Sequence, residues 1–503
     1  MVEIIDIVLP IFTLAIAALL TIPIFRRIRK TKNPMGWMIG WFVAVFVAAG
    51  AGVANLAVTY YSQYGTTSPP ILDFGLNGTN PFSSAFMIDA ISIFMAIIVV
   101  ALAAVVIIYS VFSVGGTERP SERYFAILLM TTAGLLGAVL AGDLLTLFIF
   151  WEVATAGAAF LMLFKKNVFS INATLKYLIM IIIASAFTVL GISIVYGITG
   201  TLNYIAVGSA LAKVGTSNHL LIIAFIFIAA GYAIEAAIVP FHFWLPDAYT
   251  AAPASSAAFL SALIDQGGYY ILIRVLLYIL LPSTLNWTLM LAVLAAVTMI
   301  VGNLFALIQT DVKRLIAYIC VADVGYNLVA ITSVTALGIM GNLYFFLVGG
   351  ITTALAFMAI GVINSHGFRS LDDMSGLGKR MPLVCLALVM ASLSFAGVPP
   401  FGGFFAKLFV FTAAIDGKLA WLAIIGVIMS VLQTAYLFRL IYVFYGKKPA
   451  VETSIKESTR ILIPIFIFAG ALIVVGIYPQ IVLGLVHPVV NQLKSLIPTL
   501  STI

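Results

Sequence analysis

The sequence predicts an all-α, polytopic membrane protein with about fourteen transmembrane helices. Thirteen apolar stretches, most of them twenty or more residues long, run through the 503 residues, and a fourteenth is split by Pro399-Pro400. About 20 apolar residues span a bilayer, and backbone groups in lipid must bond within their own segment, so these stretches are helices. The composition is 63% hydrophobic and 9% charged, against roughly 25% charged residues in soluble domains. A soluble protein is therefore excluded.

The distribution of basic residues predicts the topology. When the connections are placed alternately on the two sides of the membrane, one side holds 19 Lys and Arg residues and the other holds three. This bias is typical of the positive-inside rule. It predicts a multi-pass protein of the plasma membrane with cytoplasmic basic loops and both termini outside, and it accounts for the net charge of +7 without a nucleic-acid partner. The expected spans are 4–24, 36–58, 86–113, 124–141, 143–164, 171–198, 219–239, 255–281, 286–309, 314–334, 337–364, 382–416, 419–445 and 460–485.

The middle of the chain contains a loose internal repeat, in which four landmarks recur in the same order 160 to 171 residues later. Each copy holds five predicted helices, and an odd number of spans turns the second copy upside down, as in many transporters. We therefore expect helices 1–3 in residues 1–114, one repeat in 124–281 (helices 4–8), its inverted copy in 286–445 (helices 9–13), and a cytoplasmic loop with helix 14 in 446–503. The landmark pairs are Asp143 and Asp311, Glu152 and Asp323, Pro240 and Pro400, and Arg274 and Arg439.

Each repeat contains one helix that proline interrupts. Pro240 lies in the seventh span, and Pro399 and Pro400 lie in the twelfth. Proline removes a backbone donor and clashes with the preceding turn, and the freed carbonyls are tolerated only where they face protein or water. Corresponding breaks in two repeats indicate a polar conduit; a packing kink is the alternative.

Five charged residues fall well inside predicted spans. At roughly 2.5–3.5 kcal/mol for each centrally placed charge, they are retained only if they pair, take up a proton or line water. They point to an ion-translocation path, whereas polar anchoring between helices is the alternative for any one of them. We expect Gln266 and His242, which lies in the seventh-span break, to share this path. The five charged residues are Glu152, Glu235, Asp265, Asp323 and Lys407.

Other polar residues have structural interpretations. Arg274 and Arg439 lie nearer helix ends and are expected to snorkel toward the surface. Asp143 and Asp311 stand at helix starts, where a carboxylate favours the positive end of the dipole. The cysteines and histidines have no spacing typical of a metal or cluster site, so no cofactor is expected in this chain.

Several segments resemble one known family. They are Trp151-Glu152, Val239–Ala248 with Ala252-Pro253, Gln309–Tyr318 with Gly325-Tyr326, and Ala396–Lys407. They are similar to the antiporter-like subunits of respiratory complex I, whose family includes the large subunits of multisubunit Mrp sodium/proton antiporters and of membrane-bound energy-converting hydrogenases. The resemblance implies fourteen helices, two inverted five-helix repeats and proton or sodium translocation along a polar axis at mid-membrane. It also implies that Glu152 and Lys407 match the family's fifth-helix glutamate and twelfth-helix lysine.

The departures from that family pattern concern its other basic residues. Where the family usually has lysine in the seventh and eighth helices, this chain has Glu235 and Gln266, and Leu260 stands at a histidine position. Asp323 replaces a frequent histidine in the tenth helix, and Thr353 replaces the usual lysine in the eleventh. Carboxylates with bare carbonyls are hard oxygen ligands, so sodium near Glu152 and Glu235, or altered proton coupling, is the hypothesis that these exchanges favour.

The sequence thus predicts an ion-translocating subunit of a multisubunit redox-driven or Mrp-type complex, without a catalytic centre of its own. Iron–sulfur or other redox centres are expected in partner subunits, and other membrane subunits are the expected partners. A membrane-bound hydrogenase or a sulfur-reducing archaeal complex is slightly preferred as the parent assembly. A structural subunit that docks its neighbours without transport, and a self-sufficient secondary transporter, remain the alternatives.

Overall fold

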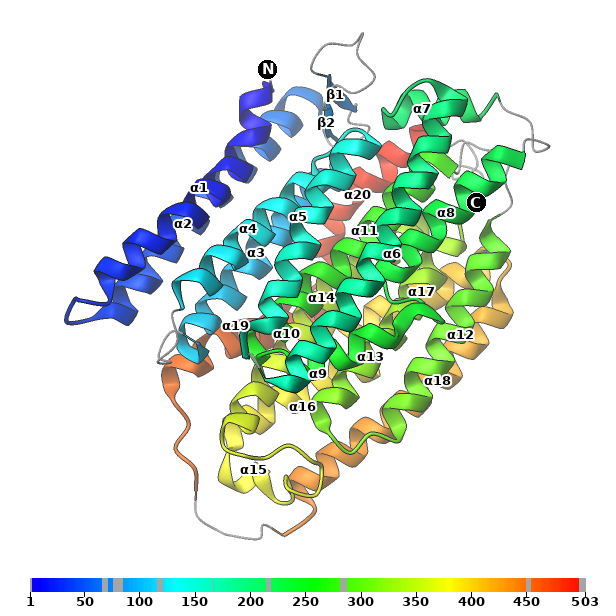
Figure 1. Ribbon diagram of the computed structural model, residues 1–503. Helices are drawn as coiled ribbons and strands as arrows, with labels where there is room; N and C mark the ends of the chain where they lie inside the picture. The colour runs from blue at the N-terminus through cyan, green and yellow to red at the C-terminus, as the bar shows by residue number, and fades with distance from the viewer. Residues whose placement is uncertain are drawn as a thin grey trace.

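The computed structural model describes residues 2–65, 71–75, 85–114, 121–165, 167–213, 219–280, 287–448 and 454–496. The chain forms a bundle of long, roughly parallel helices (Figure 1). In the described residues, twelve helices are long and apolar enough to span a membrane, and two shorter apolar helices, His219–Glu235 and Pro382–Ala396, are followed by a break and a second segment. When each broken helix is counted once, the bundle has the fourteen spans that the sequence predicts.

The N-terminal part consists of three helices and a small sheet. α1 and α2 form a hairpin at one edge of the bundle (Figure 1). The antiparallel strands between α2 and α3 pair Phe74 with Phe86, which the all-α prediction did not include. These elements are α1 (Ile4–Ile28), α2 (Pro34–Tyr64), β1 (Leu72–Gly75), β2 (Ala85–Ile88) and α3 (Ala90–Ser113).

The first repeat contains four regular spans and one broken one. The eighth span, which runs from α10 to η4, contains two π-helical turns, one of them directly before Asp265. Such turns interrupt the regular i→i−4 bonding and are frequent at functional sites. The elements are α4 (Glu122–Val139), α5 (Leu144–Met162), η1 (Leu163–Lys165), α6 (Val168–Thr199), α7 (Tyr204–Leu211), α8 (His219–Glu235), η2 (Phe241–Phe243), α9 (Trp244–Ala251), α10 (Ala254–Phe259), η3 (Leu260–Ile264), α11 (Asp265–Val275) and η4 (Leu276–Leu280).

The second repeat has the same order of elements in the opposite orientation. Its short surface helix α15 lies at the bottom of the bundle, whereas α7, the short helix of the first repeat, lies at the top (Figure 1). The elements are α12 (Thr288–Leu307), α13 (Val312–Thr332), α14 (Ala336–Ser365), α15 (Leu377–Arg380), α16 (Pro382–Ala396), α17 (Gly402–Asp416) and α18 (Ala420–Tyr445).

Equivalent backbone bonds connect the loops of the two repeats. In the first, the Leu144 amide donates to the Leu202 carbonyl (3.1 Å); in the second, the Val312 amide donates to the Arg369 carbonyl (3.3 Å). Both bonds tie the N-terminus of the second helix of the repeat to the chain that follows its third helix. The inverted pair of five-helix units is therefore present in the backbone as well as in the sequence.

The break after α8 is a Schellman turn. The Ile238 amide donates to the Ala233 carbonyl (2.9 Å) and the Ala237 amide to the Ile234 carbonyl (3.2 Å), which satisfies two carbonyls that the helix end would otherwise leave free. Ala237 lies in the left-handed region at φ 52°, and the Val239-Pro240 peptide is cis.

The break after α16 repeats this turn 160 residues later. The Val398 amide donates to the Leu393 carbonyl (3.0 Å) and the Gly397 amide to the Ser394 carbonyl (3.0 Å). Gly397 has φ 74°, and the Pro399-Pro400 peptide is cis. The predicted breaks in the seventh and twelfth spans are therefore confirmed, and both are built by the same local structure.

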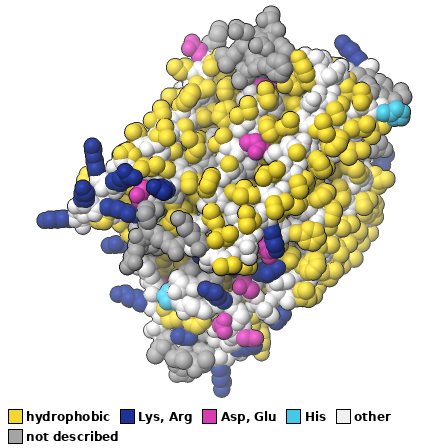
Figure 2. Space-filling view, viewed as in Figure 1, with side chains coloured by type: hydrophobic (Ala, Val, Ile, Leu, Met, Phe, Trp, Pro, Cys, Tyr) yellow, Lys and Arg dark blue, Asp and Glu magenta, His cyan; other side chains and the backbone are white. Residues whose placement is uncertain are grey.

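The most buried helices are the eighth span (Ala254–Ile279), α13 and α14. In the most apolar stretch of each helix, the share of residues that are buried is 100%, 94% and 89%, respectively, whereas it is only 33% in α6 and in α18. The face shown in Figure 2 is largely hydrophobic, and most basic side chains in view lie toward its left and lower parts. We call the end of the bundle that carries Lys165, Lys313, Arg314 and Arg369 the basic end.

The C-terminal region differs from the prediction of one span over 460–485. Two helices are present, α19 (Thr459–Ile477) and α20 (Gln480–Leu496), and the break falls at Pro479, which lacks an amide donor. α20 packs against α14 and α3, and the Gln492 side chain accepts a hydrogen bond from the Ala90 amide (2.9 Å).

Candidate functional site

The first-repeat carboxylates Glu152 and Glu235 lie close enough to interact electrostatically. Glu152, on α5, is half-buried and accepts a hydrogen bond from the Ser185 hydroxyl of α6 (2.6 Å). Glu235 is the last residue of α8 and only 4% exposed, and the Trp151 side chain lies beside it as a hydrogen-bond donor. Within the part of the chain that the structure describes, neither carboxylate forms an ion pair. The described residues therefore supply neither carboxylate with a Lys or Arg counter-charge.

Aromatic side chains connect these carboxylates to the centre of the bundle. Tyr177 on α6 interacts electrostatically with Glu152, Glu235 and Asp265, and its hydroxyl donates to the Thr155 carbonyl (3.2 Å). Asp265 follows the π-helical turn η3, is buried, and accepts a hydrogen bond from the Tyr249 hydroxyl (2.5 Å). The carboxylate of Asp265 is therefore held by a neutral donor.

Gln266, the next residue, faces the second repeat. Its Nε2 lies 3.5 Å from the position that a Cβ on Gly349 of α14 would occupy. Its Oε1 is buried without a hydrogen-bond partner among the described residues. Gln266 therefore supplies an unused polar atom beside Asp265.

In the second repeat, a carboxylate and a lysine face each other. Asp323 on α13 interacts electrostatically with Asp265 on one side and with Lys407 on the other. The Lys407 ammonium of α17 donates to Ser430 (2.9 Å) and Gln433 (2.6 Å) of α18. It also lies 4.7 Å from the ring centroid of Tyr326. A cavity beside Asp323 and Lys407 has room for about one water molecule.

His242 forms no ion pair with the row among the described residues. It forms part of η2, is 4% exposed, and packs against the rings of Phe243 (4.5 Å) and Phe305 (6.4 Å). The Pro240 carbonyl lies beside the His242 ring as a hydrogen-bond acceptor. Its assignment to the ion path stays a prediction, like that of the other residues of the row.

The arrangement as a whole is a row of four carboxylates, one glutamine and one lysine on neighbouring helices of both repeats. Groups of three or more metal-ligating side chains are not found in the described residues, so any cation would be held by pairs of carboxylates with neutral oxygens. Such a row can relay protons or pass a hard cation between oxygen ligands. The helix breaks Pro240 and Pro399-Pro400 stand beside the row, close to Glu235 and Lys407 in the chain.

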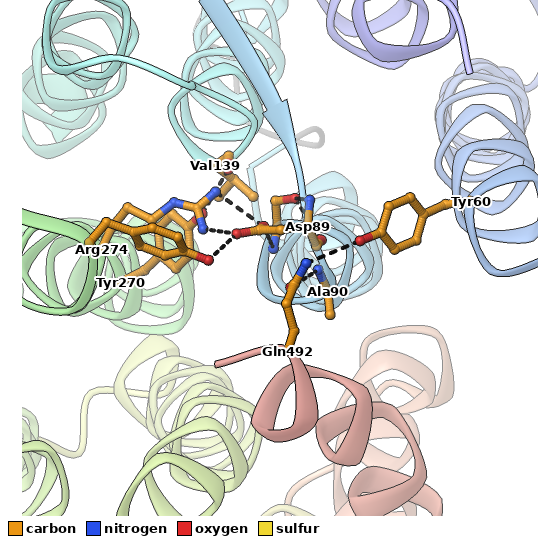
Figure 3. A network of polar contacts seen from close by, with 9 residues as sticks. Tyr60, Asp89, Ala90, Val139, Tyr270, Arg274 and Gln492 are labelled. Atoms are coloured by element: carbon orange, nitrogen blue, oxygen red, sulfur yellow. Dashed lines mark hydrogen bonds and ion pairs between the residues drawn. The ribbon is translucent and has the colours of Figure 1, made fainter. Parts of the chain in front are cut away.

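The sequence analysis missed a second buried charge network, centred on Asp89 (Figure 3). Asp89 forms an ion pair with Arg274, and the two side chains are 0% and 1% exposed. The Tyr278 hydroxyl also donates to Asp89 (2.5 Å). The prediction that Arg274 snorkels to the surface is therefore wrong, because a buried carboxylate at the start of α3 supplies its counter-charge.

This network fixes the start of α3. The side chain of Asp89 caps the helix by accepting from the Ser92 amide (2.9 Å). Gln492 of α20 bonds the Ala90 amide and donates to the Tyr60 hydroxyl (3.2 Å). Figure 3 shows Arg274 and Tyr60 approaching from opposite sides. One sequence pattern could have indicated the role of Asp89: an Asp followed three residues later by Ser at the start of an apolar run is a capping pattern.

The capping predictions for the two helix-start aspartates are confirmed. Asp143 accepts hydrogen bonds from the Leu145 and Thr146 amides (2.8 and 2.7 Å). Asp311 accepts from the Arg314 amide (2.9 Å). These aspartates align the repeats with an offset of 168 residues, so Asp323 lies one helical turn beyond the strict equivalent of Glu152.

Comparison with known proteins agrees with this architecture. Residues 141–433 match the family described as NADH:quinone oxidoreductase/Mrp antiporter, TM. The chain is 32% identical over 431 residues to NADH-quinone oxidoreductase subunit N of Heliobacterium modesticaldum, covering 85% of this chain and 90% of the relative. It is 32% identical over 414 residues to F(420)H(2) dehydrogenase subunit N of Methanosarcina mazei, covering 79% and 83%.

Solved structures share the fold over nearly the whole chain. A chain of the membrane-bound sulfane sulfur reductase, an archaeal respiratory membrane complex, superposes with a TM-score of 0.87 at 26% identity, covering 98% of this chain and 99% of that one. A chain of the Mrp complex from Dietzia superposes with a TM-score of 0.83 at 22% identity, covering 99% of both. With its matching family segment, its inverted repeats and these relatives, the chain belongs to the NADH:quinone oxidoreductase/Mrp antiporter family of transmembrane subunits.

Proposed function

We propose that this subunit translocates protons, sodium ions or both along the row Glu152, Glu235, Asp265, Asp323 and Lys407. The observation that supports this most is the continuity of the row. Each member interacts electrostatically with the next, directly or through Tyr177, from the half-buried Glu152 on α5 to the buried Lys407 on α17. Charged groups within spans are costly and commonly mark ion pathways.

The chemistry of the first half favours sodium. Glu152 and Glu235 interact without a neighbouring Lys or Arg among the described residues, and only neutral donors, Ser185 for Glu152 and Trp151 for Glu235, lie beside them there. A small hard cation prefers such oxygen ligands. Protons remain the second candidate cargo, because the Asp323 and Lys407 half has an acid and a base facing one another.

The assembly follows from the relatives. We propose that the chain works beside other membrane subunits in a redox-driven or Mrp-type complex. The similarity to a chain of an archaeal respiratory complex supports a redox-driven parent, with iron–sulfur or other redox centres in partner subunits. The basic end faces the cytoplasm in this proposal, which places both termini outside.

Transport by the purified parent complex in vesicles tests the row. Proton movement is followed with a pH-sensitive dye and sodium uptake with a radioactive tracer. Glu152→Gln and Lys407→Gln should each slow transport at least about tenfold, equivalent to about 1.4 kcal/mol in the rate-limiting barrier. Glu235→Lys should lower sodium uptake more than proton movement, because it places a cation where sodium would bind. Lys448→Gln, which removes an exposed charge, is the control and should leave both rates unchanged.

A structural role without transport is the alternative that the packing supports. The buried members of the row are only 4% to 7% exposed, and the cavity at Lys407 has room for about one water molecule. Unchanged proton and sodium rates in both Glu152→Gln and Lys407→Gln would decide for this docking role. Transport by the chain without its partners would instead indicate a self-sufficient transporter.

A further inference from the structure

We propose that a cavity at the basic end of the bundle binds the phosphate headgroup of an anionic phospholipid. The cavity measures about 630 Å³, within the range of ligand-binding pockets. It is lined by the end of α3, by η1 and the start of α6, by the α9–α10 junction, by the start of α13, by the end of α14 with Arg369 beyond it, and by the start of α19. It is separate from the row of carboxylates, and nothing in the proposed function requires it.

Positive charge dominates the lining. Among the described residues, four basic side chains (Lys165, Lys313, Arg314 and Arg369) line the cavity, against one acidic residue, Asp311. Arg314 is neutralised by Asp247 (3.2 Å), which also binds Lys176. This lining opposes the approach of a cation, so the cavity is a poor mouth for a sodium or proton path and a good site for an anion.

Lys313 gives the strongest indication of an anion. Its side chain is 4% exposed, and its ammonium donates to the Ala252 carbonyl and to the Thr250 carbonyl (3.2 Å). Both acceptors are uncharged, and the ammonium has a third donor. Lys165 and Arg369 lie near enough to repel it electrostatically, whereas Asp311 attracts it, so two like charges act on it against one opposite charge. A bound oxyanion would relieve this repulsion and accept the third hydrogen bond.

The remaining lining suits an amphiphile. Phe112, Phe169 and Ile461 contribute apolar surface to the same cavity, and Phe169 is 48% exposed at the start of α6. The Asn364 Oδ1 is buried without a hydrogen-bond partner in the described residues, so this amide can turn toward a headgroup. Basic pockets between transmembrane helices recognise anionic lipid headgroups, and a lipid would satisfy both the charged and the apolar wall.

The test measures lipid binding by the full-length chain in neutral detergent after removal of native lipid. Native mass spectrometry and thermal unfolding are recorded while dioleoyl phosphatidylglycerol or dioleoyl phosphatidylcholine is added. The unaltered chain should bind phosphatidylglycerol at least about tenfold more tightly and should be stabilised by it, because a ligand of the folded state raises the unfolding temperature.

The Arg369 and Lys379 variants use exposed positions so that folding is not disturbed. Arg369→Gln should weaken phosphatidylglycerol binding about fivefold, and Arg369→Glu about twentyfold, given the typical contribution of one basic residue. Lys379→Gln and Lys379→Glu remove or reverse an equally exposed charge outside the lining and should change binding less than about twofold. Lys313→Gln should weaken binding beyond Arg369→Gln.

Three outcomes would overturn the proposal. Equal affinity for the two lipids would exclude a headgroup site. Equal losses in the Arg369 and Lys379 variants would show surface attraction only. Stabilisation by inorganic phosphate, at matched ionic strength against chloride, as strong as that by phosphatidylglycerol would assign the cavity to a soluble oxyanion instead of a lipid. This lipid-binding measurement does not depend on transport. The transport rates of the same Arg369 variants can be measured separately.

Discussion

The break between α8 and α9 and the break between α16 and α17 have the same backbone turn, but the side chains around them differ. Glu235 ends α8, whereas Phe395 has the equivalent position in α16. Seven residues after Pro240 the chain has Asp247, which pairs with basic residues at the basic end. Seven residues after Pro400 it has Lys407, which donates hydrogen bonds to Ser430 and Gln433. The shared turn satisfies the backbone in a membrane, and each half is then free to present a different charge.

The two repeats also differ in the burial and pairing of the arginine in their last helix. Arg274 is buried and paired with Asp89, whereas Arg439, its counterpart in the repeat, is exposed. Arg274→Gln should lower the free energy of unfolding by about 3–5 kcal/mol, because it leaves a buried carboxylate without its cation. Arg439→Gln should change it by less than about 0.5 kcal/mol. Unfolding in mixed detergent micelles measures both.

A double variant distinguishes the ion pair from general damage. Asp89→Asn combined with Arg274→Met removes both charges, and replacing a buried pair by neutral groups is often close to neutral. We expect it to recover a large part of the stability that Arg274→Gln loses. If the double variant is no more stable than Arg274→Gln, or if Arg439→Gln is equally damaging, then the pair is not the reason that this half depends on its arginine.

The two breaks also differ in how closely another helix approaches them. A Cβ on Gly476 of α19 would lie 1.9 Å from the Pro400 carbonyl oxygen, whereas a Cβ on Gly268 of α11 would lie 3.7 Å from the Ala236 Cα. Gly476→Ala should therefore destabilise the protein by about 1–3 kcal/mol, as overpacking does. Gly268→Ala should be neutral or slightly stabilising, since alanine favours helix. Thermal unfolding of the two variants compares them directly, and equal effects would contradict the difference in packing.

Much of the fold was accessible from the sequence because bilayer thickness and proline chemistry are local constraints. They predicted fourteen spans, the inverted repeats and the breaks at Pro240 and Pro399-Pro400. The division of the last span at Pro479 was missed, and proline alone does not decide it, because Pro464 and Pro488 lie inside α19 and α20. The partner of Arg274 could not be predicted, since Asp89 is 185 residues away in the chain and only tertiary packing brings the two together.

The candidate site was predicted by residue type, and its geometry came from the structure. Each intramembrane charge is expensive on its own, which singled out Glu152, Glu235, Asp265, Asp323 and Lys407. Their order along one row depends on helix packing, which the sequence alone does not give. The role of the row in transport stays a prediction that the vesicle measurements address.

The smallest effect concerns the residue at the left-handed position of each Schellman turn, Ala237 in the first break and Gly397 in the second. An alanine in this conformation costs about 1–2 kcal/mol. Gly397→Ala should therefore lower the free energy of unfolding by about 1–2 kcal/mol, and its added methyl would also lie 3.2 Å from Cδ of Lys407. Ala237→Gly should raise it by less than about 1 kcal/mol, because the flexibility of glycine in the unfolded chain offsets most of the relief.

Unfolding in mixed detergent micelles resolves the sign of each change. Opposite signs at the two positions would show that the turns are equivalent and that the first half tolerates a strained alanine where the second half has glycine. If Ala237→Gly were as destabilising as Gly397→Ala, the alanine methyl would have to make a packing contact worth more than the backbone strain. The first break would then be held by its side chains, and the equivalence of the two turns would be limited to their hydrogen bonds.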